Sequence, residues 1–346
     1  MSHLLERTLI AREWADSKIL LHSRGIYGKV VSAVIWTDAR GGDGEPLVPV
    51  DPLTLVAKIN SNPYILLHNH DPGRPKGQVL ESAYFETDGG EKFVAAVLGY
   101  YAGGDVVGFC EFNLDINAPV PSPKALPPLP DEYWIQFATD PREVDEGWLN
   151  QVAKNDGLIR IVRAELSHNA ADSAQELIRV GLIYLAVVWN PFVTSIASEA
   201  GKAAYVATHA WLRKLLERMA DRRNPILDIH THQDGCQVSF ILRGKDVKGH
   251  YAAHDSLSAA AAQAAKLVAK LKSRGSGARQ LIYEFDRDAL LWYPSFAVLN
   301  DNKIVTDNIG LIAIEQLPNG LSLGLTRERS LFPADTSVDN ESNDEA

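Results

Sequence analysis

Apolar and polar residues alternate along five segments in the first third of the chain. Alternation with a period of two is typical of strands that bury one face, and the glycine-rich turns DGGE and AGGD separate some of these segments. The segment DPLTLVAKIN has helical spacing instead. The pattern therefore predicts a mostly antiparallel, barrel-like β domain over residues 1–116 with one short helix. Its predicted strands are IYGKVVSAVIW, PYILLHNH, GQVLESAYFET, KFVAAVLGYY and DVVGFCEFNLDI.

Residues 117–130 read NAPVPSPKALPPLP and contain six prolines. Proline removes a backbone donor and favours extended conformations, so this stretch is predicted to be a semi-rigid linker. A second domain over residues 131–330 would follow it. Residues 331–346 have five acidic side chains and no basic one, which predicts a disordered acidic tail.

The second domain mixes strand and helix patterns. YWIQFA and LIRIVRAEL are predicted strands, and DPREVDEGWLNQVAK is a predicted helix with Asp140 as its N-cap. Two long helices over 171–189 and 191–221 would form a helical hairpin, and the Ala-rich SLSAAAAQAAKLVAKLKS would be a further helix that ends at Gly275. The fold class expected for the whole chain is therefore α+β.

Composition limits the functions to consider. The chain has 346 residues, a formal net charge of -10 and only two cysteines. These numbers predict a cytoplasmic protein without a disulfide framework, and they do not favour nucleic acid as a partner. The uncharged run 180–198 has the length of a membrane span, but Asn190 and Pro191 together signal a helix start inside it. Membrane association is therefore not favoured.

A histidine pair lies in LLHNHDPGRPKG, residues 66–77. His68 and His70 are two positions apart, so on an extended chain they would share a face, as metal ligands or a catalytic histidine with a helper would. The alternative is that both histidines cap the end of the strand and hydrogen-bond the turn that follows.

Residues 26–112 resemble the prohead proteases of tailed phages. The features that carry the resemblance are a long strand, the acidic loop DARGGDGEPLV, a short helix, a strand ending in Asn69-His70-Asp71, the GRPKG turn and a glycine-punctuated strand. The resemblance implies a β-barrel serine protease fold in which His70 is catalytic, and it gives His68 no role.

The chain departs from that family where the nucleophile should stand. The segment DVVGFCEFNLDI contains no serine, and Cys110 occupies the comparable place. Because Cys110 would be a strand residue flanked by Phe109 and Phe112, it is expected to be a buried, inert thiol. Ser122 lies in the proline-rich linker, where nothing fixes its geometry.

A second histidine pair, His230 and His232, lies in DIHTHQDG. If Asp234 and Gly235 form a two-residue turn, one face of the hairpin holds Leu227, Ile229, Thr231, Val238, Phe240 and Leu242, and the other holds Asp228, His230, His232, Gln237, Ser239 and Arg243. The second set would be a polar solvent face. Alternatively, Asp228, His230 and His232 would bind a divalent metal with help from His250 or His254.

Two functions follow from these observations. The first is a non-catalytic interaction or assembly protein that has a protein partner or associates with itself, and that the resemblance links to phage or mobile-element biology. The second is a hydrolase, either a serine- or cysteine-type peptidase that uses His70 as base with help from His68 and Asp71, or a metal-dependent enzyme that uses His230 and His232. The first is preferred because a base without a nucleophile is half a mechanism. No cofactor is expected under the first function.

Overall fold

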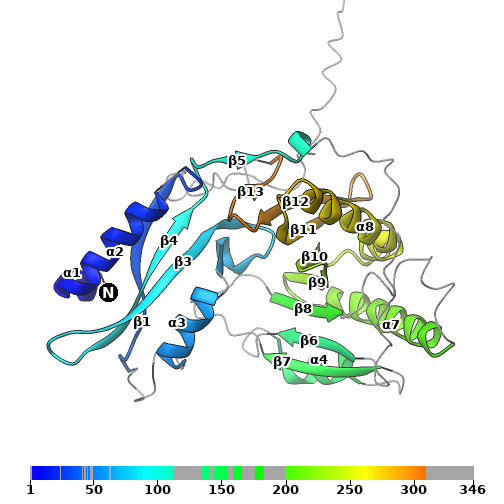
Figure 1. The fold of residues 1–346 in the computed structure, drawn as a ribbon. Helices are drawn as coiled ribbons and strands as arrows, with labels where there is room; N and C mark the ends of the chain where they lie inside the picture. The colour runs from blue at the N-terminus through cyan, green and yellow to red at the C-terminus, as the bar shows by residue number, and fades with distance from the viewer. Residues whose placement is uncertain are drawn as a thin grey trace, which may run out of the picture.

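A computed structural model describes residues 2–23, 25–40, 50–61, 64–112, 134–139, 144–154, 159–165, 176–182 and 199–308, together with 42, 44 and 46. The described residues form both helices and strands, and most strand pairs are antiparallel, which confirms the α+β class. The strands form two sheets, one of four strands and one of nine (Figure 1).

The larger sheet has the strand order β5-β13-β12-β11-β10-β9-β8-β6-β7. Its strands are β5 (Val106–Val107), β6 (Trp134–Thr139), β7 (Arg160–Glu165), β8 (Glu176–Leu182), β9 (Pro225–Gln233), β10 (Cys236–Arg243), β11 (Ala278–Asp286), β12 (Leu291–Leu299) and β13 (Ile304–Val305). The pairs β8–β9 and β10–β11 are parallel. Because parallel neighbours need a crossover connection, the long helices between these strands lie on a face of the sheet.

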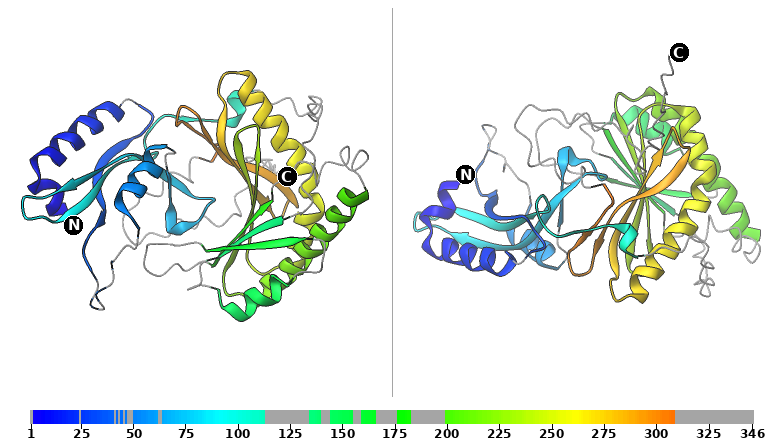
Figure 2. Two further views of the ribbon diagram at one scale, coloured as in Figure 1. Left: turned by 60° about the horizontal axis from the view of Figure 1, so that its bottom comes forward. Right: turned by 90° about the horizontal axis from the view of Figure 1, so that it is seen from above.

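Three helices cover one face of the larger sheet (Figures 1 and 2). They are α4 (Glu146–Val152), α7 (Glu199–Arg218) and α8 (Val247–Ser273), and the 3₁₀ turn η3 (Met219–Asp221) follows α7. Asp145 caps α4 by accepting from the Trp148 amide at 2.8 Å, so the predicted N-cap Asp140, which is outside the described residues, is not the residue that begins this helix.

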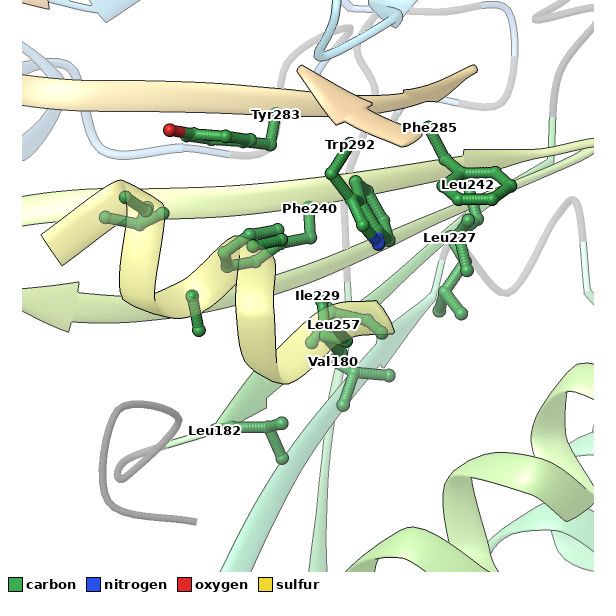
Figure 3. Close-up of a cluster of buried hydrophobic side chains, with 14 of the residues drawn as sticks. Val180, Leu182, Leu227, Ile229, Phe240, Leu242, Leu257, Tyr283, Phe285 and Trp292 are labelled. Atoms are coloured by element: carbon green, nitrogen blue, oxygen red, sulfur yellow. The ribbon is translucent and has the colours of Figure 1, made fainter. Parts of the chain in front are cut away.

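The main core lies between these helices and the sheet. Figure 3 shows Phe240, Trp292 and Leu257 packed between α8 and the strands. Two tryptophans also tie elements together through their indole N–H groups: Trp292 donates to the carbonyl of Ala253 at 2.9 Å, and Trp211 donates to that of Val152 at 2.9 Å. Indoles in an apolar core need such partners.

The predicted helical hairpin is wrong in its first half. Residues 176–182, expected inside a helix over 171–189, form strand β8 between β6 and β9. Five of its seven residues are buried, on both faces of the sheet. Because both faces are buried, the sequence of β8, ELIRVGL, does not alternate between apolar and polar residues, and a short segment of this kind cannot be distinguished from a buried helix by periodicity. The second predicted helix is confirmed for the part that α7 covers.

The smaller sheet has the order β1-β4-β3-β2 and is antiparallel throughout. The described strands form an open sheet and not the expected barrel. Its strands are β1 (Lys29–Thr37), β2 (Tyr64–Leu67), β3 (Pro75–Glu86) and β4 (Lys92–Tyr100); α1 (Ser2–Arg7) and α2 (Leu9–His22) pack on one face, and α3 (Pro52–Ser61) packs on the other. The 3₁₀ turn η1 (His68–His70) follows β2, and η2 (Phe109–Phe112) follows β5.

The smaller sheet packs on the larger one, on the face opposite the helices (Figure 2). β5 follows the smaller sheet in the chain but pairs with β13 in the larger one, so residues of the first part of the chain complete the second sheet. A shared apolar cluster fills the junction. It contains Tyr27, Leu80, Val97 and Tyr101 from the first part, and Leu177, Ile226, Ile241, Ile282, Phe296, Val298 and Ile304 from the second.

Several predicted features lie outside the described residues. They are the proline-rich linker 117–130, the acidic tail 331–346 and residues 183–198 of the uncharged run. Across the described ranges, none of the helices combines the length and the apolar composition that a bilayer crossing requires.

Candidate functional site

The segment with the first histidine pair forms a tight turn between β2 and β3. The amide of His68 donates to the carbonyl of Arg74 at 2.9 Å, and the amide of Asp71 donates to the carbonyl of His68 at 3.0 Å. Asn69 has a φ of 49°, in the left-handed region that asparagine tolerates better than most residues. The His68 side chain is half-buried, and the His70 side chain lies outside the part that the structure describes.

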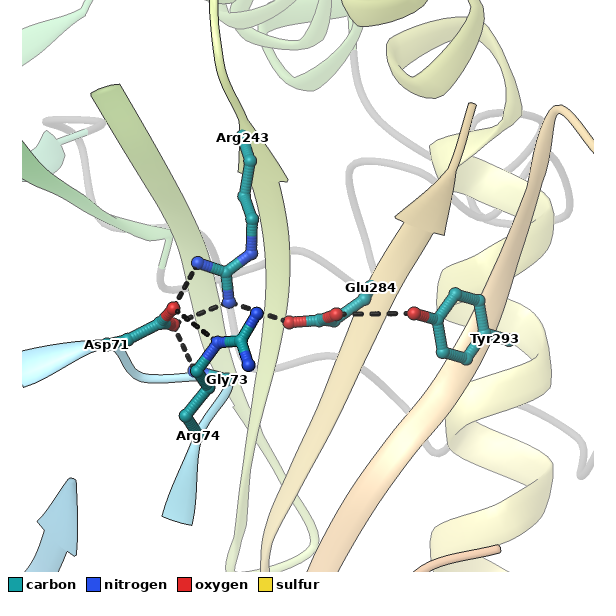
Figure 4. Close-up of polar contacts among 6 residues, drawn as sticks. All are labelled: Asp71, Gly73, Arg74, Arg243, Glu284 and Tyr293. Atoms are coloured by element: carbon teal, nitrogen blue, oxygen red, sulfur yellow. Dashed lines mark hydrogen bonds and ion pairs between the residues drawn. The ribbon is translucent and has the colours of Figure 1, made fainter. Parts of the chain in front are cut away.

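The third residue of the Asn-His-Asp motif points into the junction between the two sheets. The carboxylate of Asp71 is 1% exposed and receives both terminal nitrogens of Arg243, from β10 (Figure 4). It also accepts from the Gly73 amide at 2.9 Å and lies 3.3 Å from Nε of Arg74. A carboxylate offers about four acceptor positions. The donors from Arg243, Gly73 and Arg74 fill these positions, so Asp71 has a structural role in the junction between the two sheets.

Arg243 holds a second carboxylate as well. Its Nη2 donates to Oε1 of Glu284 on β11 at 2.8 Å, and the hydroxyl of Tyr293 donates to Oε2 of Glu284 at 3.2 Å. Burial alone would lower the pKa of Arg243, but the adjacent carboxylates of Glu284 and Asp71 outweigh burial and raise that pKa. The guanidinium is therefore permanently charged. Hereafter Asp71, Arg243 and Glu284 are called the junction clamp.

Because Gly73 has no side chain, the side chains of Arg243 and Glu284 can pack directly against its backbone. A Cβ built on Gly73 would overlap Oε1 of Glu284 and would lie 2.5 Å from Nη2 of Arg243. Neither atom is at the free end of a mobile side chain, because both are held by the clamp. The glycine of the DPGRP turn is thus required by close packing against the larger sheet.

The two cysteines lie away from this turn. Cys110 belongs to η2 and is exposed, which corrects the expectation of a buried strand residue; its amide donates to Oδ1 of Asp307 at 3.4 Å. Within residues 105–112, the part of the predicted strand that the structure describes, only Val106–Val107 form a strand, because the chain then turns to bury Phe109 and Phe112. Cys236 is buried in the main core, and burial raises its thiol pKa to about 12. Ser122 is outside the described residues.

The hairpin with the second histidine pair has the predicted register. Asp234 and Gly235 form its turn with φ values of 53° and 84°, and Ser239 pairs with His230 across the ladder. However, the face with Asp228 and His230 is not a plain solvent face. Asp228 is fully buried and accepts from Nε of Arg179 on β8 at 2.9 Å, and Ser239 is 1% exposed. Burial also lowers the pKa of His230, while His232 is exposed.

The expected helper histidines lie on the other side of the larger sheet. His250 and His254 are buried residues of α8, which packs on the face opposite Asp228 and His230. Within the described ranges, no three histidine, cysteine, aspartate or glutamate side chains are grouped so that they could hold a metal ion. The structure thus separates the residues that sequence reasoning combined.

His254 has a different neighbour that sequence analysis does not identify. Nδ1 of His209 on α7 lies 2.9 Å from Nε2 of His254, and the rings meet edge to face. Burial lowers the pKa of both histidines, that of His209 to about 4. The two residues lie on different helices 45 positions apart, so no local motif marks them. Both imidazoles are neutral at pH 7 and join α7 to α8 through one hydrogen bond.

Comparisons of the chain with protein-family models, curated proteins and solved structures gave no match.

Proposed function

We propose that this chain is a non-catalytic interaction protein whose protease-like segment has become a structural element. The support comes first from Asp71. Its acceptor positions are filled by Arg243, Arg74 and the Gly73 amide inside a buried junction. A carboxylate in this position holds the two sheets together and is not available to orient a catalytic histidine toward substrate.

The observation that carries the interaction role is the outer face of α2. Four large apolar side chains on this helix, those of Leu9, Ile10, Leu20 and Leu21, are between 50% and 75% exposed. Scattered apolar residues are common on surfaces, but a group of them on one helix face is typical of a protein contact. This face takes the place of the predicted helical hairpin as the contact surface.

The finer features of the proposal rest on sequence. The resemblance of residues 26–112 to prohead proteases supports an assembly role in phage or mobile-element biology. A cytoplasmic location is part of the same proposal, because the chain has only two cysteines and both are free thiols.

Site-specific photo-cross-linking tests this function. A photoreactive amino acid at Leu20 should give a covalent protein adduct in cells that produce the full chain, whereas the same residue at Leu290, which is 54% exposed on the β11–β12 turn, should not. In parallel, the wild type and His70→Ala are compared for cleavage of casein. Turnover that is lost on replacing His70, without an adduct at position 20, would replace the interaction role with the peptidase alternative.

A further inference from the structure

We infer that the partner of α2 is a second copy of this chain, bound through antiparallel pairing of the two α2 helices; this inference rests on the proposed function. α2 lies on the side of the smaller sheet remote from α7 and α8, so its outer face is accessible (Figures 1 and 2). Its inner face is fixed by Ala11 and Ala15, which are buried against the smaller sheet.

The exposed residues of α2 are arranged symmetrically about position 15. Leu9 and Ile10 precede Ala15 by the same number of residues as Leu21 and Leu20 follow it. At about 100° per residue, these four side chains fall within an arc of about 120°. The two apolar pairs are about three turns apart, roughly 16 Å along the axis.

A two-fold axis near position 15 matches each apolar pair with the opposite pair of the other copy. Leu9 and Ile10 of one copy then meet Leu21 and Leu20 of the second copy, twice in the dimer. A two-fold interface requires one patch to be complementary to itself, and this arrangement satisfies that requirement. A partner of unrelated sequence would not require the symmetry.

The polar residues between the apolar pairs are also complementary under the same axis. Arg12 and Asp16 are both exposed and lie on the same edge of the arc, and within the described residues neither forms an ion pair. In the antiparallel arrangement Arg12 of one copy is offset from Asp16 of the other by about 3 Å along the axis, which permits two ion pairs. Glu13 similarly faces Ser17.

The size of the contact sets the expected strength. Four apolar side chains per copy are fewer than the 20–30 residues a side of a stable interface that buries about 800 Å² per partner. The dimer should therefore be in rapid exchange with monomer and should depend on concentration.

Sedimentation velocity of the full chain tests the inference. The wild type should shift from monomer to dimer as its concentration rises, and Leu20→Glu should abolish this shift. Leu290→Glu is a matched change at another exposed leucine and should leave the monomer–dimer equilibrium unchanged. All of these side chains are at least half exposed, so the folded monomer should keep its Tm. A dimer that is insensitive to Leu20→Glu, or a monomer at every concentration, overturns the inference.

A charge swap tests the orientation. Arg12→Glu and Asp16→Arg should each weaken the dimer several-fold, and the double variant should restore Kd to within about threefold, because the ion pairs re-form with reversed polarity. No restoration would overturn the antiparallel register.

Cross-linking gives an independent test in a Cys110→Ser background. Mixing Glu13→Cys chains with Ser17→Cys chains should give more disulfide-linked dimer than either variant gives by itself. Asp88→Cys on the β3–β4 turn should give no disulfide-linked dimer. A Leu20 photo-adduct with a different protein would support the proposed function and overturn only the self-association inferred here.

Discussion

Asp71 and Arg243 are 172 positions apart in the chain and form a two-pronged ion pair that joins the smaller sheet to the larger one. The exposed fractions of the two side chains are 1% and 15%. Desolvation of two charges offsets much of their attraction, so the pair is better understood as fixing the position of the turn than as a large net source of stability. Removal of Asp71 leaves the buried guanidinium of Arg243 with Glu284 as its carboxylate partner, and removal of Arg243 leaves two buried carboxylates without their cation.

We therefore expect Asp71→Ala to lower the free energy of unfolding by about 3 to 5 kcal/mol. Chemical denaturation measures this change, with Asp88→Ala on an exposed turn as a control that should stay within about 0.5 kcal/mol of wild type. The double variant Asp71→Ala, Arg243→Met should cost less than the sum of the single changes, because each single change already removes the Asp71–Arg243 contact; the loss of the Arg243–Glu284 contact remains in the double variant. Additive losses would show that the two residues are not coupled.

Gly73→Ala should destabilise the protein by about 1 to 3 kcal/mol, because the new methyl group overlaps Glu284 and crowds Arg243. Gly89→Ala is the matched control: a Cβ there would lie 3.7 Å from Oγ1 of Thr87, an ordinary contact, and Gly89 is exposed. Equal unfolding free energies for the two variants would contradict the packing of the turn against the clamp.

Acid should weaken the contact between α7 and α8. The pKa of His209 is about 4 in the folded protein, below the ordinary value of 6.5, so the unfolded chain binds more protons between these limits. The histidine contribution to stability is thus present above about pH 6.5 and is lost as pH falls toward 4. Arg213 and Asp255 are the charged groups nearest the pair, and they act in opposite directions on the pKa of His209.

The measurement for this effect is the free energy of unfolding between pH 4 and pH 7. His209→Gln should flatten the pH dependence relative to wild type. An unchanged slope in His209→Gln would mean that this histidine titrates normally in the folded protein.

The two thiols should differ in reactivity. Cys110 is exposed and should react with a chromogenic thiol reagent in the native protein. Cys236 is buried and its pKa is raised to about 12, so it should react only after denaturant is added. The expected stoichiometry is one thiol per chain before unfolding and two after. Equal reaction of both cysteines in native buffer would contradict the position of Cys236 in the core.

The features predicted from sequence are mainly local. The β9–β10 register follows from the alternation of Leu227, Ile229 and Thr231 and from the turn residues Asp234 and Gly235, so neighbours in sequence contain enough information. β8 could not be identified because a strand buried on both faces has no alternation. α2 is not predicted from its sequence either, because exposed Leu20 and Leu21 spread apolar residues around the helix and hide its amphipathic pattern.

The candidate site depends on contacts that no local pattern encodes. Asp71 was identified by its motif, but Arg243 appears in the sequence as one more polar residue of a hairpin, and Glu284 as one of a strand. Only the docking of the smaller sheet on the larger one brings the three together. Likewise His254 was considered as a helper of His230, whereas packing of α7 on α8 pairs it with His209.

The long separation between Asp71 and Arg243 has a consequence during protein synthesis. At about 5 to 20 residues per second, the ribosome adds Arg243 roughly 10 to 30 s after Asp71. Throughout that interval Asp71 lacks its guanidinium partner, and the apolar surface around Val97 and Tyr101 has no larger sheet to cover it. Strand β13, which receives β5, is added later still. The nascent chain therefore presents an uncovered apolar face for a long time, which is the state that chaperones recognise.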